Sequence, residues 1–143
     1  MNTDRPPITA ELGRVVYGAM YLIGGVIHLF LWWRDPGVYA EITPYILFEW
    51  YRVLWTGYVL PNLDILLPVL AGFELLLAGL VLSRERRACL GHGIGAAFQV
   101  ALAPLGFWWP ANAVLAAGHT LLARYRFRTA PVAELHRRLR RSV

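Results

Sequence analysis

The sequence is poor in cysteine and has no lysine, and the first of these absences restricts its chemistry. Cys89 is the only cysteine among 143 residues, so the chain can form neither an internal disulfide nor a Cys-x-x-Cys redox pair. Thiol–disulfide exchange within the chain is therefore excluded. All 14 basic side chains other than histidine are arginines, a composition that suggests a bacterial genome rich in G and C.

Sequence motifs for several common chemistries are missing as well. The chain has no His-Glu-x-x-His motif and no Cys/His cluster of the kind that holds zinc. It also has no P-loop, no Gly-x-Ser-x-Gly motif and no dinucleotide-binding fingerprint. We therefore predict no metal site, and we expect no nucleic-acid partner.

Charged residues are scarce at 16%, whereas 57% of the residues are hydrophobic. The apolar residues form four long stretches. A helix needs about 20 residues to cross the ~30 Å hydrocarbon core of a bilayer, with ~17 as the practical minimum, so the first two stretches fit well and the last two are short. Their approximate limits are residues 12–33, 63–82, 88–105 and 110–125.

These stretches predict helices that lie in a membrane. Backbone polar groups without partners cannot face lipid, so a spanning segment must be a helix or part of a closed barrel, and the stretches lack the alternation of a barrel strand. A soluble bundle would need polar outer faces, which these segments do not have. We predict an all-α membrane protein with one domain, a bundle of four transmembrane helices.

The positions of the arginines predict how this bundle is oriented. With four spans, only Arg34 and Arg52 lie on one side, and the other twelve arginines lie on the side of both termini. Arginines in short loops stay cytoplasmic, so we expect a multi-pass protein with cytoplasmic N- and C-termini. All six tryptophans then lie on the outer side, where they are expected to form an interfacial belt.

The connection between the first two spans predicts an additional helix on the outer side. Residues 45–60 form an aromatic segment with one narrow polar stripe, Glu49, Arg52 and Thr56, in which Glu49 and Arg52 are spaced to form an ion pair. Pro44 and Pro61 bound the segment closely. We predict an amphipathic helix in the membrane interface rather than a fifth span.

Residues 126–143 form a basic tail on the cytoplasmic side. Four apolar residues recur in it at helical spacing, which predicts a short basic helix on the anionic leaflet. The alternative is a frayed tail whose charges only set the topology. The four residues are Val132, Leu135, Leu139 and Val143.

Each predicted span carries its polar residues on one face that is also rich in small residues. Small residues let helices approach closely, and polar side chains hydrogen-bond across the seam. These faces are therefore predicted to form the interior of the bundle. The polar residues are His28, Glu74, His92, Gln99, Asn112 and His119.

Four of these residues form the candidate polar site. Counting inward at ~1.5 Å per residue places Glu74, Gln99 and Asn112 near the middle of the membrane and His28 nearer the outer face. A charged glutamate there costs at least ~2.5 kcal/mol, so Glu74 is expected to be neutral or paired with a protonated histidine. The alternative is that Glu74 is a hydrogen-bonded staple that holds the bundle together.

His92 and His119 raise a different possibility. They are predicted to lie at similar depth on adjacent antiparallel helices, where two imidazoles could ligate a b-type haem. Glycines at positions 91, 93 and 95 would leave room for the macrocycle, although glycine-rich helices also mark tight packing.

Three segments resemble the small four-helix membrane proteins of the DoxX-like family. The segment GGVIHLFLWWRDPGVYAEITPY is similar to the first span of that family, with its glycine pair, histidine and following Pro-x-x-Tyr. In GFELLLAGLVLSRERRACLG a glutamate follows a glycine by two residues and a basic turn comes next, as in the second helix of the family. FWWPANAVLAAGHTLL resembles the last helix, so the resemblance covers roughly residues 12–125.

The resemblance implies a bacterial inner-membrane protein with a role in redox assemblies. Some relatives are the membrane subunit of a thiosulfate:quinone oxidoreductase. By this analogy Glu74 and His28 occupy recurrent polar positions, where quinone contact or proton handling would occur. Relatives that act on thiols use cysteine pairs, which this chain lacks.

Three functions follow from the sequence as hypotheses. The first is an accessory membrane subunit of an oxidoreductase assembly, with a cleft for a quinone or another lipophile between Glu74, His28 and the outer aromatic residues. The second is a scaffold without catalytic activity that binds a larger membrane protein or further copies of itself. The third is a haem carrier that uses His92 and His119.

Overall fold

The computed structural model describes residues 6–131, 133–134, 137 and 140, and these residues contain no strand. The all-α class is therefore confirmed. The basic tail helix was predicted from Val132, Leu135, Leu139 and Val143, which lie outside the described residues. The α-helices are α1 (Ile8–Arg34), α2 (Glu49–Leu54), α3 (Leu63–Val81), α4 (Glu85–Leu102) and α5 (Trp109–Leu122).

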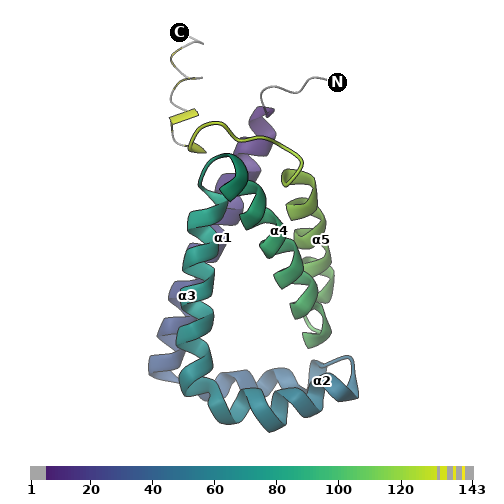
Figure 1. The fold of residues 1–143 in the computed structure, drawn as a ribbon. Coiled ribbons are helices and arrows are strands. Elements are labelled where there is room, and N and C mark those ends of the chain that lie inside the picture. Colours follow the sequence, from purple (N-terminus) through teal and green to yellow (C-terminus); the bar gives the residue numbers. More distant parts are fainter. Residues whose placement is uncertain (1–5, 132, 135–136, 138–139, 141–143) are drawn as a thin grey trace.

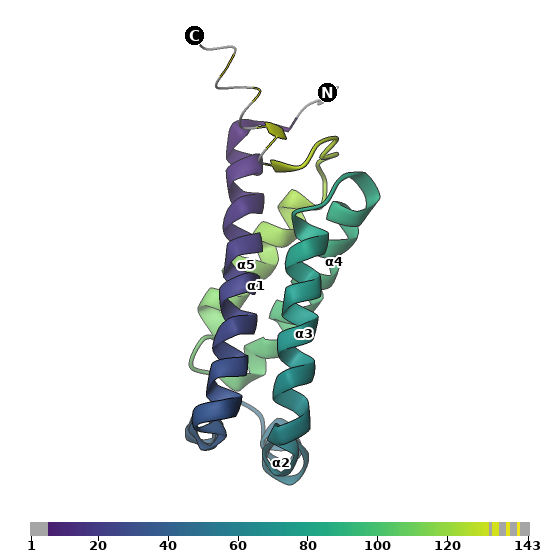
Figure 2. The same cartoon turned by 90° about the vertical axis from the view of Figure 1, so that its left-hand side faces the viewer.

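The four long helices form two pairs. α1 packs against α3, and α4 packs against α5. In Figure 1 the two pairs approach each other at the end that carries both termini and separate toward α2. Figure 2 shows α1 and α3 side by side along their length. We call the two ends of the bundle the terminal end and the α2 end.

Three helical stretches are long and apolar enough to cross a membrane, namely Ile8–Arg34, Glu49–Val81 and Glu85–Leu105. α5 has 14 residues and is about 21 Å long at 1.5 Å per residue, which is less than the thickness of a bilayer core. Three of the four predicted membrane helices thus have structural support, and a fourth crossing by α5 stays a prediction.

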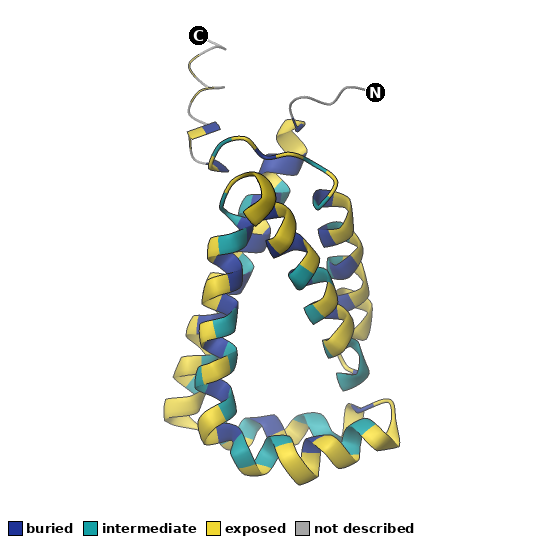
Figure 3. Ribbon diagram, viewed as in Figure 1, coloured by how far each residue is buried: buried dark blue, intermediate teal, exposed yellow. Residues whose placement is uncertain are grey.

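Burial follows the helix faces. Figure 3 shows the buried residues on the sides of the helices that face one another, with exposed residues on the outer sides. Many of the exposed residues are large and apolar, which suits contact with lipid. Examples are Val16 on α1, Val69 on α3, Val100 on α4 and Val114 on α5.

The connection between α1 and α3 lies across the α2 end of the bundle (Figure 1). α1 ends at Arg34, just before Asp35 and Pro36, because a residue that precedes proline disfavours the helical conformation. A 3₁₀ helix, Pro36–Tyr45, follows. α2 then continues through a π-helical turn and a 3₁₀ turn into α3, so the predicted interfacial helix is joined to the second span. The predicted ion pair between Arg52 and Glu49 is present at 3.0 Å.

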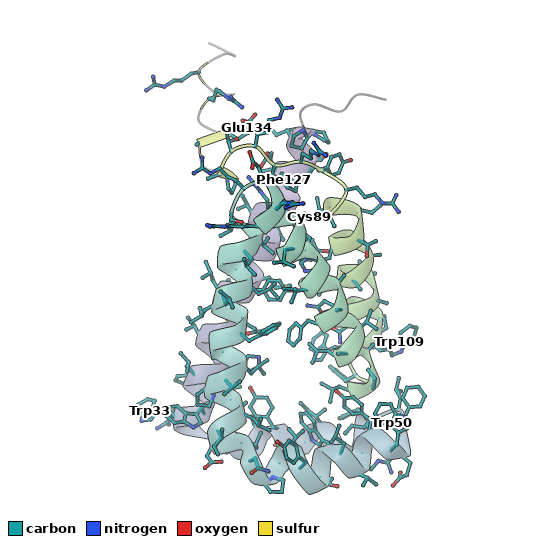
Figure 4. The ribbon with its side chains drawn as sticks, viewed as in Figure 1. Trp33, Trp50, Cys89, Trp109, Phe127 and Glu134 are labelled. Carbon is teal, nitrogen blue, oxygen red and sulfur yellow. The ribbon has the colours of Figure 1, made fainter. Side chains whose placement is uncertain are left out.

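The tryptophans gather at the α2 end, as Trp33, Trp50 and Trp109 show in Figure 4. Five of the six are exposed, which agrees with an interfacial belt. The prediction was wrong for Trp55, which is only 8% exposed. Its ring is part of a buried apolar cluster beneath α2, so it serves as a packing residue. The other buried members of this cluster are Tyr39, Ile46, Leu63 and Leu67.

A buried arginine closes the terminal end. The guanidinium group of Arg14 pairs with the Glu11 carboxylate at 2.7 Å and donates to the carbonyl oxygens of Ser83 and Thr129, each at 2.9 Å. It also lies 4.3 Å from the centre of the Phe127 ring. Arg14 therefore joins α1 to the α3–α4 turn and to the segment after α5, whereas the sequence suggested only a topological charge.

The turn between α4 and α5 is tied to the connection at the α2 end. The Leu47 N–H donates to the Pro104 carbonyl at 3.0 Å. Gly106 has a φ of 88°, and a Cβ atom at this position would lie 1.6 Å from the carbonyl oxygen of Tyr45. Only glycine is compatible with so close a backbone approach.

Candidate functional site

His28 lies between two polar side chains that come from different elements. The Tyr39 hydroxyl, in the 3₁₀ helix after α1, is hydrogen-bonded to Nδ1 of His28. On the other side, Nε2 of His28 lies 3.6 Å from Oε2 of Glu74 on α3. This second distance is longer than a hydrogen bond and suits an ion pair only when the imidazole is protonated.

Glu74 is buried, with 6% of its surface exposed, and this confirms that it faces the interior of the bundle. A Cβ atom at Gly24 would lie 2.7 Å from its Oε2 atom, so the missing side chain at Gly24 makes space for the carboxyl group. Oε2 is buried and has no hydrogen-bond partner among the described residues. A buried polar atom without a partner requires an explanation, and a site for a ligand or a proton supplies one.

The protonation state of the Tyr39 hydroxyl sets the tautomer of His28. Burial raises the pKa of the Tyr39 hydroxyl to about 12, and the nearby Glu74 carboxylate adds to this effect. The hydroxyl therefore keeps its proton at neutral pH. When it donates that proton to Nδ1, a neutral imidazole carries its own hydrogen on Nε2. This N–H lies on the side of Glu74.

His28 also lines a cavity at the α2 end with a volume of about 480 Å³. Small-molecule sites usually have volumes of ~300–1,000 Å³ and largely apolar walls with a few polar groups, and this cavity fits both criteria. Asn112, at the start of α5, contributes a second polar side chain. The aromatic part of the wall consists of Tyr39, Tyr45, Phe107 and Trp108.

Gln99 belongs to a different polar group, between α1, α4 and α5. Its amide nitrogen lies 3.3 Å from the Tyr21 hydroxyl, and that hydroxyl lies 2.7 Å from Nε2 of His119. Nδ1 of His119 lies 2.8 Å from Nδ1 of His92. Of the four predicted site residues, His28 and Glu74 are therefore adjacent, Asn112 lines the same cavity as His28, and Gln99 lies elsewhere.

The arrangement of His92 and His119 does not fit a bis-histidine haem. An iron atom and its macrocycle would have to lie between the two imidazoles, but their nitrogens are at hydrogen-bond distance. Close packing instead fills the space beside two of the glycines that were expected to leave room for the macrocycle. Added Cβ atoms would lie 2.7 Å from the Val81 nitrogen at Gly91 and 2.5 Å from the His119 ring at Gly95.

Three tyrosines in these polar groups were not among the predicted site residues. Tyr39 is the tyrosine of the Pro-x-x-Tyr segment, and this motif could have indicated it as a site residue. Tyr21 lies on the small-residue face of the first span, seven residues before His28. Tyr17, whose hydroxyl donates to the Leu115 carbonyl at 2.9 Å, lies one helical turn before Tyr21, and this spacing was the available signal for it.

Metal binding receives no support from the geometry. Within the part of the chain that the structure describes, no three or more His, Cys, Asp or Glu side chains lie together in a way that could hold a metal ion.

Comparison of the chain with protein-family models, with curated proteins and with solved structures gives no match. The resemblance to the DoxX-like family therefore stays a prediction from short motifs, and the functional argument rests on the site itself.

Proposed function

We propose that this chain is an integral protein of the bacterial inner membrane that binds a quinone or a similar lipophile in the cavity beside His28. In this proposal it is an accessory subunit of an oxidoreductase assembly and both termini are cytoplasmic. The observation that carries the proposal is the position of His28. Its imidazole lines an apolar cavity and is held between the Tyr39 hydroxyl and the Glu74 carboxyl group.

The polar groups at this cavity suit a ligand with carbonyl oxygens. Such oxygens accept hydrogen bonds, and the amide of Asn112 is able to donate one. The Nε2–H group of His28 is able to donate another, because Oε2 of Glu74 lies 3.6 Å away, beyond hydrogen-bond distance. A bound quinone supplies the redox chemistry, and its reduction takes up protons as well as electrons. Glu74, whose Oε2 atom lies 3.6 Å from Nε2 of His28, would exchange a proton with the imidazole.

The wall of the cavity also suits entry from the bilayer. It is aromatic and aliphatic over most of its surface, with Glu41 as its one acidic lining residue. It lies at the α2 end, next to the exposed tryptophans. With cytoplasmic termini, this end faces the outer leaflet, where a lipophile would enter between α1, α5 and the α1–α2 connection.

A scaffold without catalytic activity is the second candidate function. α2 and its flanking residues expose large apolar side chains at the α2 end, including Phe48, Trp50, Val53 and Tyr58. Such a surface suits a larger membrane protein or a second copy of the chain. Gentle purification would then recover a partner in fixed stoichiometry, and loss of that partner on substitution of Trp50 would support this function.

The quinone proposal is tested by direct binding to the purified protein in mild detergent. We expect His28→Ala to weaken the binding of a short-chain ubiquinone analogue about tenfold, because a hydrogen bond to a strongly polar group contributes ~1.5 kcal/mol or more. Glu74→Gln is expected to weaken binding as well, because it removes the carboxyl group beside His28. Glu49→Gln is the matched control, since this carboxylate is exposed and does not line the cavity.

A further variant separates a binding site from a structural role. Ile42→Trp fills the cavity from its apolar wall and leaves His28 and Glu74 unchanged. Loss of binding in this variant, with normal accumulation in the membrane, supports the cavity. Unchanged binding in all three variants would refute the proposal, and failure of the His28 and Glu74 variants alone to accumulate would favour the staple role of Glu74.

A further inference from the structure

A second cavity lies at the terminal end, away from His28 and independent of the proposed function. Its volume is about 550 Å³, and it lies where the end of α5 meets the beginning of α4. Four of the residues that line it are arginines and one is acidic, so its wall is strongly positive. These residues are Arg86, Arg124, Arg126, Arg128 and Glu85, and Cys89 lies beside them.

Packing fixes the backbone that carries three of these arginines. Phe127 is fully buried beneath Arg14, and its carbonyl oxygen accepts a hydrogen bond of 2.7 Å from the Glu85 N–H. Successive residues of an extended segment point to opposite sides, so Arg126 and Arg128, on either side of Phe127, are exposed. The positive wall thus belongs to the folded bundle.

An apolar surface adjoins the positive wall on both helices. Leu90 lies one helical turn after Arg86 on α4, and Leu121 lies nearly one turn before Arg124 at the end of α5. The two leucines are 55% and 56% exposed. The helices touch at this level, since the Cys89 thiol lies 3.3 Å from the carbonyl oxygen of Ala123.

We propose that this cavity binds the phosphate head group of an anionic phospholipid, whose acyl chains lie along Leu90 and Leu121. Guanidinium groups bind phosphate through paired, charge-assisted hydrogen bonds. The helical stretch Glu85–Leu105 is long and apolar enough to cross a membrane, so its first residues lie at the level of the head groups. A soluble phosphate compound would use the arginines but not the exposed leucines.

This site differs from a general attraction between arginines and an anionic leaflet. A general attraction holds no particular lipid. A built cavity binds one lipid per chain, saturates, and covers the residues that line it. Cys89 is the only cysteine of the chain and is exposed beside the cavity, so its reactivity reports whether the cavity is occupied.

The experiment uses the complete protein in phosphatidylcholine vesicles with increasing fractions of phosphatidylglycerol. The measured quantity is the rate at which Cys89 reacts with an uncharged, membrane-permeant maleimide. We expect phosphatidylglycerol to slow this reaction to a plateau. Native mass spectrometry of the detergent-purified protein is expected to show one retained phosphatidylglycerol per chain.

Two double variants provide the matched comparison. Arg124→Gln with Arg126→Gln removes two arginines of the cavity and is expected to weaken protection of Cys89 about fivefold for each arginine. Arg84→Gln with Arg87→Gln removes the same charge at the same end from residues that do not line this cavity. Protection in this control is expected to equal that of the unchanged protein.

Several results would overturn the lipid site. Equal loss of Cys89 protection in both double variants would mean that the protection depends on surface charge and not on the cavity. Protection by inorganic phosphate alone, in detergent, would indicate a soluble anion rather than a lipid. If phosphatidylglycerol fails to slow the reaction and native mass spectrometry retains no lipid on the unchanged protein, the proposal is wrong. None of these results bears on quinone binding at His28.

Discussion

The Nδ1 atoms of His92 and His119 lie 2.8 Å apart, although the residues are separated by 27 positions in the chain. One nitrogen must donate a hydrogen and the other must accept it, because two lone pairs repel at this distance. The neighbouring side chains set the direction of this hydrogen bond. Gln99 donates to the Tyr21 hydroxyl, and that hydroxyl in turn donates to Nε2 of His119. His119 then carries its hydrogen on Nδ1 and donates to His92.

This relationship predicts a colourless protein. The two imidazoles are hydrogen-bonded to each other and leave no space for an iron atom between them. We therefore expect no Soret band in the visible spectrum of protein purified from cells supplied with a haem precursor. A reducible Soret band that disappears in His119→Ala would contradict the structure. It would mean that the two imidazoles separate to admit iron.

Gly95 is predicted to be essential for the packing of His119, because an added Cβ atom would lie 2.5–2.9 Å from three atoms of that ring. Overpacking of this kind costs ~1–3 kcal/mol, so Gly95→Ala should lower the free energy of unfolding by about that amount. The measurement is thermal or denaturant unfolding in detergent.

Gly93→Ala is the control for this prediction. It lies on the same helix and has no atom within 4 Å of the added Cβ, so its stability should stay within ~1 kcal/mol of the unchanged protein. Equal stability of the two alanine variants would show that the His92–His119 packing is looser than described.

Among the arginines that the structure describes, Arg14 is predicted to be the most sensitive to substitution. Arg14→Gln removes a fully buried cation that joins three segments, and breaking a buried pair in this way costs ~3–5 kcal/mol. We expect the variant to unfold at a much lower temperature. The segment that carries Phe127 should also be cut faster by protease.

Arg52→Gln provides the comparison at an exposed ion pair. The side chains of Arg52 and Glu49 are 43% and 73% exposed, and such pairs contribute no more than ~1 kcal/mol. If the Arg14 and Arg52 variants lose similar amounts of stability, Arg14 does not hold the terminal end together.

Much of the fold could be predicted from the periodicity of the sequence. The predicted spans at residues 12–33 and 63–82 correspond to α1 and α3 within a few residues, and those at 88–105 and 110–125 correspond to α4 and α5. The faces predicted to point inward were also correct in most positions. Glu74, His92, Gln99, Asn112 and His119 are all buried.

The candidate site was only partly predictable. His28 and Glu74 were predicted to share one cleft, and in the structure Nε2 of His28 lies 3.6 Å from Oε2 of Glu74. Gln99 was placed with them and lies instead beside Tyr21, because the rotation of α4 about its axis decides which neighbour its amide meets. The role of Tyr39 depends on how the chain folds back after Pro36, and no periodic pattern specifies that turn.

The helices, their inner faces and the exclusion of thiol exchange all follow from the sequence. These properties depend on residue type and on spacing along one helix, where the geometry of 3.6 residues per turn relates each position to its neighbours. Tertiary structure alone decided the pairing of His92 with His119, the burial of Trp55 and the closure of the terminal end by Arg14. Each of these contacts depends on how separate segments are rotated and shifted relative to one another, and that arrangement is set by the packing of the whole bundle.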